Sequence, residues 1–272
     1  MNNREIKRRI ASVKETVKIT KAMYSISVAK MMRGRTALPV ALRFYDASLA
    51  LMDKLAASGD IYFKDRGDRK AFIVIGGDKG LCGDYNQRVY VCALDHLERT
   101  EERYLFTVGS VVRDLLAKAG MASDVEFLHS ADNPSPEASY SMAADLINLF
   151  DEGLLDEVYL VYSKVEGNHS EVCADRLIPY LSEKDLPLPQ EGISQEAVER
   201  GVYQYLAASI YRALISASLA EHLARIKAMP VATENGEEMI AELTAKYNQV
   251  RQESITRAMQ DVSAHSDYEE SV

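Results

Sequence analysis

The segment between Arg4 and Arg35 carries a repeating pattern that few folds can accommodate. Apolar or small residues recur in it at alternating steps of four and three. These residues are Ile6, Ile10, Val13, Val17, Thr20, Tyr24, Ser27 and Met31. Such steps mark the a and d positions of a heptad repeat, here sustained without a proline. The pattern predicts a long helix with one narrow stripe, which a second helix must cover.

A matching pattern lies near the other end of the chain. Beyond Pro230, Asn235 and Glu238 resemble a capping box, so we expect a renewed helix to begin there. Its residues at steps of three and four are Ile240, Leu243, Tyr247, Val250 and Ser254. The two ends therefore predict an antiparallel coiled coil. We expect its seam to contain Ile6, Ile10, Val13, Val17, Leu243, Tyr247 and Val250.

The first helical pattern continues to about Ser58, where Gly59 can terminate a helix. Pro39 should kink or split this helix, because proline lacks an N–H group and clashes with the preceding turn. A proline inside a helix costs about 3 kcal/mol, and a glycine such as Gly236 costs about 1 kcal/mol. Residues 196–228 are also helical in pattern and rich in small side chains.

The middle of the chain has a different period. Short apolar runs predict strands at 71–75, 104–108, 125–128 and 157–162. Predicted helices alternate with them at 84–99, 111–119 and after Ser135, which can cap a helix that begins at Pro136. This alternation predicts an α/β domain with a largely parallel sheet, followed by a proline-bearing loop at 182–195. We therefore expect a central domain at 68–195, and a discontinuous coiled-coil domain made of 1–58 and 196–272.

Charge is distributed unevenly along the chain. Residues 1–43 contain 11 Lys and Arg against 2 Asp and Glu, a net charge of +9, whereas the whole chain carries −9. A cationic helix on an anionic body suits docking against acidic protein surfaces. Nucleic-acid binding is not expected, because the helix lacks interleaved aromatic residues and its stripe is matched within the chain.

Other site classes find little support in the sequence. Neither an apolar run long enough to span a membrane nor a signal peptide is recognisable. The three cysteines form no disulfide framework and no zinc spacing, which fits a reducing cytoplasm. The five histidines form no ligand pair at helical spacing, so we expect no metal site and no cofactor.

A glycine-rich turn at Gly76–Asn86 is the segment most typical of an enzyme. It follows a predicted strand and precedes a predicted helix, the order found in phosphate-binding loops. It matches neither the P-loop nor the G-x-G-x-x-G pattern, so we interpret it as a demanding structural turn. Its key residues are Gly77, Gly80, Leu81, Cys82, Gly83 and Asn86. A stand-alone nucleotide-binding protein that uses this turn remains the alternative.

Three segments resemble the gamma subunit of F-type ATP synthases. The segment Arg4–Met23, with Lys-Ile-Thr-Lys-Ala-Met at its end, resembles the opening signature of that family. Gly77–Asn86 resembles the second signature, and Ala232–Thr256 resembles the C-terminal one. The segments occur in the same order as in the family and extend over the whole chain.

The resemblance implies a rotor in the central stalk of the synthase, built from an antiparallel coiled coil and a Rossmann-like α/β domain. Such a rotor turns inside a hexamer of alpha and beta subunits and stands on the epsilon subunit and the c-subunit ring. It couples transmembrane proton or sodium flow to ATP synthesis or hydrolysis, and it has no catalytic residues of its own. The resemblance also implies a peripheral position on the cytoplasmic face of a bacterial plasma membrane.

By the same resemblance, two groups of residues would contact partner subunits. Lys18, Lys21 and Met23 match the region that faces the moving part of beta. Arg251, Gln252 and Thr256 match the region that meets the hexamer.

The chain departs from the family pattern in several places. Tyr24–Ser27 replaces a small apolar stretch, and Pro39 and Pro230 fall where uninterrupted helix is usual. The tail beyond Asp261 is acidic, and the sequence pattern after Tyr162 predicts a shortened sheet. These departures indicate a divergent member, and a scaffold that kept the coiled coil without the motor is a further alternative. No insertion with a redox-active cysteine pair is present, so thiol control is not expected.

Overall fold

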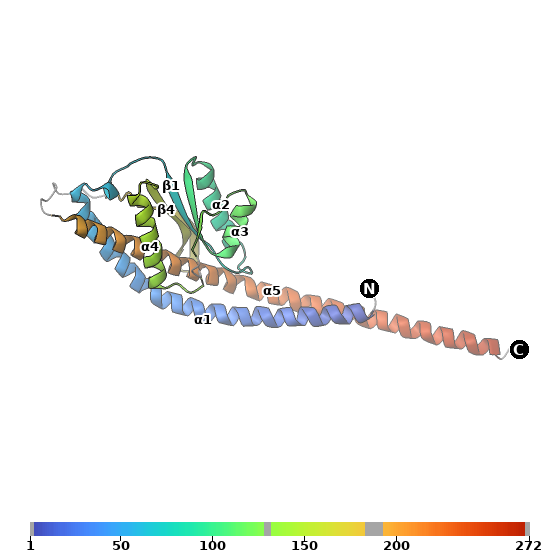
Figure 1. The fold of residues 1–272 in the computed structure, drawn as a ribbon. Coiled ribbons are helices and arrows are strands. Elements are labelled where there is room, and N and C mark those ends of the chain that lie inside the picture. The colour runs from blue at the N-terminus through green and yellow to red at the C-terminus, as the bar shows by residue number, and fades with distance from the viewer. Residues whose placement is uncertain (1–2, 128–131, 183–192, 270–272) are drawn as a thin grey trace. The chain divides into compact units, whose positions relative to one another are not determined.

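The computed structural model describes residues 3–127, 132–182 and 193–269. The chain divides into two compact units. Unit 1 comprises Met1–Ile26 and Lys227–Val272, and unit 2 comprises Ser27–Ile226. Helices α1 (Asn3–Leu55) and α5 (Gln195–Glu269) each contribute to both units (Figure 1). The predicted domain boundaries near residues 58 and 196 lie close to the end of α1 and the start of α5, and they remain a prediction.

Unit 1 consists of α1 and α5 lying side by side in opposite directions. Thr20 meets Thr233 across the pair, and Val17 lies next to Gly236. The earlier residue of α1 thus contacts the later residue of α5, so the two helices are antiparallel. The predicted fold class is confirmed: an antiparallel coiled coil of the terminal helices, with an α/β domain between them in the sequence.

Both long helices are continuous through their prolines. Pro39 lies inside α1 and Pro230 inside α5. Pro39 was predicted to kink or split α1: the helix is not split, and it is bent along its lighter blue part (Figure 1). The predicted helix start at Asn235 and Glu238 is wrong, since both lie in the interior of α5. Packing of the flanking turns outweighs the local cost of each proline ring, which points to solvent in both cases.

Unit 2 contains a five-stranded sheet with the order β3-β2-β1-β4-β5. The strands are β1 (Lys70–Ile75), β2 (Arg103–Val108), β3 (Val125–Glu126), β4 (Glu157–Glu166) and β5 (His169–Ile178). The first four are parallel, and β5 pairs antiparallel with β4. The four predicted strands are therefore confirmed, apart from Leu128, which lies outside the described residues.

The expectation that the sheet is short beyond Tyr162 is wrong. Strand β4 continues to Glu166, and β5 returns along it after a tight turn in which Gly167 has a φ of 62°. Sequence patterns missed β5 because its side chains are mostly half-buried and of mixed polarity. Most of the predicted loop at 182–195 lies outside the described residues.

Helices cover both faces of the sheet. They are α2 (Tyr85–Glu98), α3 (Ser110–Lys118) and α4 (Pro136–Asp151), with short 3₁₀ turns at Ala56–Ser58 and Ile61–Phe63. Ser135 caps α4 as predicted, accepting a hydrogen bond from the Ala138 amide. Adjacent residues of β1 point to opposite faces: Ile73 joins a core with α4 and the long helices, and Phe72 joins a core with α2 and α3.

Candidate functional site

The facing sides of α1 and α5 in unit 1 form the first candidate site, the seam. Ile6 and Val17 are buried, and Ile10 and Val13 are half-buried. On α5, Met229 is buried, and the half-buried residues of unit 1 up to Val250 are Ala228, Ala232, Thr233, Gly236, Ile240, Leu243, Tyr247 and Val250. The structure thus places all seven residues of the predicted seam on the covered faces of the two helices.

Two residues of the predicted heptad patterns, Tyr24 and Ser254, lie outside the seam and are exposed. Tyr24 is 40% exposed, and the preceding Met23 is half-buried instead. The covered face of α1 passes from Thr20 to Met23 and then to Ser27. A straight helix drifts relative to a strict heptad by about 20° per repeat, so the covered position shifts by one residue after a few turns.

Polar contacts occur inside the seam as well as beside it. Thr20 is 3% exposed, and its hydroxyl lies 2.7 Å from that of Thr233. Lys21 and Glu237 form an exposed ion pair at 2.7 Å. Gly236 allows close approach of the helices, since an added Cβ would lie 2.6 Å from Cγ2 of Val17.

The last part of α5 extends beyond its partner. Thr20 faces Thr233, so Asn3, the first described residue of α1, is level with about Val250. Residues 251–257 are all exposed. The residues expected to contact partners differ in exposure: Lys18, Lys21, Arg251, Gln252 and Thr256 are exposed, and Met23 is half-buried.

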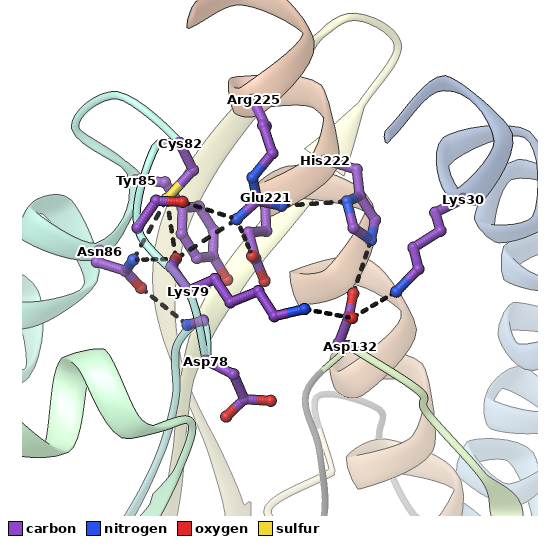
Figure 2. Close-up of polar contacts among 12 residues, drawn as sticks. Lys30, Asp78, Lys79, Cys82, Tyr85, Asn86, Asp132, Glu221, His222 and Arg225 are labelled. Carbon is purple, nitrogen blue, oxygen red and sulfur yellow. Dashed lines mark hydrogen bonds and ion pairs between the residues drawn. The ribbon is translucent and has the colours of Figure 1, made fainter. Parts of the chain in front are cut away.

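The glycine-rich turn in unit 2 is closed on itself by hydrogen bonds (Figure 2). The Gly77 amide donates to the side-chain oxygen of Asn86 at 2.8 Å. The Asn86 amide group reaches the Lys79 carbonyl at 3.4 Å and the Cys82 sulfur at 3.3 Å. Leu81 has a φ of 61° and is 57% exposed at the tip of the turn. Asn86, the second residue of α2, therefore holds the turn in its shape.

Gly76 and Gly77 of this turn accommodate protein groups, whereas Gly80 and Gly83 have no protein atom within 4 Å of a Cβ position. A Cβ at Gly76 would lie 2.6 Å from Val112 of α3, and a Cβ at Gly77 would lie 3.0 Å from the carboxylate of Glu221. A buried carboxylate at this place would repel a phosphate. Burial raises the pKa of the Cys82 thiol, which disfavours a reactive thiolate. The geometry thus supports the structural interpretation of the turn over nucleotide binding.

A buried ion pair on α5 attaches this helix to the turn. Glu221 and Arg225 are 3% and 4% exposed, and they lie one helical turn apart. The same guanidinium nitrogen that binds Glu221 also donates to the carbonyls of Gly80 at 3.1 Å and Lys79 at 3.4 Å. The Tyr85 hydroxyl adds a bond to the carbonyl of Ala217, farther back on α5. Burial raises the pKa of Glu221, and the nearby Arg225 opposes that shift.

His222 extends this polar cluster toward α1. Its Nδ1 accepts from Arg225 at 3.3 Å, because arginine can only donate. A neutral ring then carries its proton on Nε2, which lies 3.2 Å from Asp132 Oδ1. The other oxygen of Asp132 pairs with Lys30 of α1 and lies 4.0 Å from Lys79 (Figure 2). Burial lowers the pKa of His222 to about 4, so the ring is neutral at pH 7.

None of these three α5 side chains was predicted as part of a site. A weak signal was present, since Glu221 and Arg225 are spaced four apart in residues 213–226, where all other side chains except His222 are small or apolar. Their partners outside α5 lie more than 80 positions away in the sequence, so no local pattern could identify them. Among the described residues, no group of His, Cys, Asp and Glu side chains is arranged to hold a metal ion. No described helix is both long enough and apolar enough to cross a bilayer.

The chain was compared with known proteins. A family model described as ATP synthase matches residues 2–265. The ATP synthase gamma chain of Caldanaerobacter subterraneus subsp. tengcongensis is 34% identical, with 96% of this chain and 98% of that protein covered. The chain belongs to the ATP synthase gamma-chain family. Another gamma chain, from Halothermothrix orenii, is 32% identical over 95% of this chain and 96% of its own length.

Solved structures share the fold of this chain at lower sequence identity. A chain in the Euglena gracilis mitochondrial ATP synthase structure titled OSCP/F1/c-ring has a TM-score of 0.73 and 16% identity, with 97% of this chain and 93% of that chain covered. A chain of the Tetrahymena thermophila mitochondrial ATP synthase central stalk and c-ring has a TM-score of 0.60 and 21% identity, with 79% and 99% covered. These similarities concern the fold, and they agree with the arrangement of helices and strands described above.

Proposed function

We propose that this gamma chain is the central-stalk rotor of an F-type ATP synthase. It turns inside a hexamer of alpha and beta subunits and couples proton or sodium flow to ATP synthesis or hydrolysis. The observation that carries the proposal is the family match from residue 2 to residue 265, which includes both helices of unit 1. A rotor needs a stiff, elongated element, and an antiparallel helix pair with a continuous seam provides one.

In this proposal the chain contributes surfaces and no catalytic group. Lys18, Lys21 and Met23 on α1 contact the moving part of beta, and the exposed positions Arg251, Gln252 and Thr256 on α5 meet the hexamer. The basic character of the first 43 residues supports contact with acidic protein surfaces. The epsilon subunit and the c-ring are the further partners, on the cytoplasmic face of a bacterial plasma membrane.

The test is reconstitution with alpha and beta subunits from the same organism. We expect the three proteins to form a complex in which ATP hydrolysis drives rotation of a bead attached to unit 2. The alpha and beta subunits without this chain serve as the control and should show no such rotation. A chain that does not associate with alpha and beta would overturn the proposal.

Calorimetry of the isolated chain with ATP and ADP separates this function from the nucleotide-binding alternative. We expect no heat of binding, because Asn86, Val112 and Glu221 occupy the space beside Gly76 and Gly77. Binding at micromolar concentration would favour the alternative.

A further inference from the structure

The Glu221–Arg225 pair is placed where it controls the shape of the glycine-rich turn. Arg225 donates to two successive carbonyls, those of Lys79 and Gly80, directly before Leu81. Leu81 has a positive φ, a conformation that is strained for any residue except glycine. Such strain persists only where surrounding contacts determine the backbone. The contact from α5 is therefore a direct determinant of the turn.

The same cluster reaches α1. Asp132, in the loop before α4, lies between His222 of α5 and Lys30 of α1 and contacts both. Lys30, His222 and Asp132 are all at least half-buried, so water screens their interaction weakly. Both long helices and the turn are thus connected by one continuous set of polar contacts (Figure 2).

The position of the cluster along the chain is also distinctive. Unit 2 ends at Ile226 on α5, one residue beyond Arg225, and it begins at Ser27 on α1, shortly before Lys30. The cluster therefore lies close to the ends of the α1 and α5 segments that belong to unit 2.

We propose that Glu221, Arg225, His222, Asp132 and Lys30 form a clamp that fixes the glycine-rich turn to both long helices, and that torque passes through this clamp between the α/β domain and the helix pair of unit 1. The second half of this statement rests on the proposed rotor function. Arg225 is in this sense a positioning residue: it acts by holding the turn and has no contact with nucleotide.

Stability alone is a poor explanation for the buried pair. A buried ion pair is expensive to desolvate, and its replacement by apolar residues of similar volume is often neutral for folding. This property supplies the test variant. Glu221→Met with Arg225→Met removes both charges and the bonds to the turn without leaving a buried charge unpaired.

The first experiment measures amide hydrogen exchange in the purified full-length chain. We expect the double variant to accelerate exchange across residues 77–86 by about tenfold, as for the loss of one or two net hydrogen bonds. The control is Glu196→Met with Arg200→Met, a pair of the same residue types at the same spacing on α5, whose side chains are 71% and 79% exposed. It should leave exchange in the turn unchanged.

The second experiment uses the complete synthase in vesicles and compares ATP-driven ion pumping with ATP hydrolysis. We expect the double variant to lower the ratio of pumping to hydrolysis several-fold, with the control variant at the wild-type ratio. A residue that only stabilises the fold would reduce the amount of complex and leave this ratio unchanged.

The outcomes separate the two halves of the proposal. Unchanged exchange in the turn, or a double variant that does not fold, would overturn the clamp. Faster exchange with an unchanged pumping ratio would overturn its role in torque. Wild-type chain that does not assemble with alpha and beta would overturn the rotor function, and the exchange experiment would still decide the clamp.

Discussion

Helix α5 has the same secondary structure in both units, but its surroundings differ. In unit 2, none of residues 201–226 is exposed, so this part is covered on all sides. In unit 1, none of residues 230–250 is fully buried, and apart from the adjacent Ala232 and Thr233 only every third or fourth residue is half-buried. Beyond them, residues 251–257 are all exposed. The first part is stabilised as a core element, and the second part is stabilised by one narrow seam.

The largest expected difference concerns two Arg–Glu pairs on this helix. Arg225→Met leaves Glu221 buried without a countercharge, and we expect a loss of about 3–5 kcal/mol in the free energy of unfolding. Arg200→Met breaks an exposed pair with Glu196, for which we expect less than about 1 kcal/mol. Urea unfolding of the full chain measures both. Similar losses for the two variants would show that the Glu221–Arg225 pair is exposed to water in solution.

Leucines provide the second comparison. Leu206 in unit 2 is fully buried, so Leu206→Ala should cost about 2–5 kcal/mol. Leu243 in unit 1 is half-buried, and Leu243→Ala should cost about 1 kcal/mol, since less apolar area returns to water. Thermal unfolding followed by circular dichroism gives both values. A larger loss at Leu243 would mean that the seam contributes more than its burial indicates.

The seam was predictable because it is a local property. Its residues recur at the period of a helix, and the spacing of Leu243, Tyr247 and Val250 needed no tertiary information. The strands with continuous apolar runs, such as β1 and β4, were predictable for the same reason. The exceptions are Ser254, which is exposed, and Tyr24, where the accumulated drift of the helix moved the covered position to Met23.

The errors share a different cause. Pro39 and Pro230 are strong local signals for a helix end, yet the helices continue because neighbouring turns are held by tertiary packing. Strand β5 lacks a strong local signal and depends on pairing with β4. The clamp joins residues from four distant segments, so only the folded structure reveals it.

Acid should affect the two parts of α5 unequally. The pKa of His222 is about 4 in the folded chain against an ordinary 6.5, because burial disfavours the charged ring. Between these values the unfolded chain binds the proton more readily, so the free energy of unfolding falls as pH is lowered from 6.5 to about 4. The expected loss is at most about 3 kcal/mol.

Urea unfolding at a series of pH values tests this expectation. His222→Gln should be less sensitive to pH in this window than the wild type. His169→Gln, at an exposed position on β5, is the matched control and should keep the wild-type dependence. Equal curves for the wild type and His222→Gln would show that His222 is not buried as a neutral ring.

The smallest effect is expected at Gly236, and here the sign is informative. Helix propensity alone favours Gly236→Ala by about 1 kcal/mol. An added Cβ, however, would lie 2.6 Å from Cγ2 of Val17, and overpacking of this kind costs about 1–3 kcal/mol. We therefore expect Gly236→Ala to destabilise the chain slightly in thermal unfolding. Combination with Val17→Ala should remove the clash and make the alanine at 236 favourable on that background. If Gly236→Ala instead stabilises the chain with Val17 intact, the helices are farther apart than the structure places them, and the narrow seam would not explain the stability of unit 1.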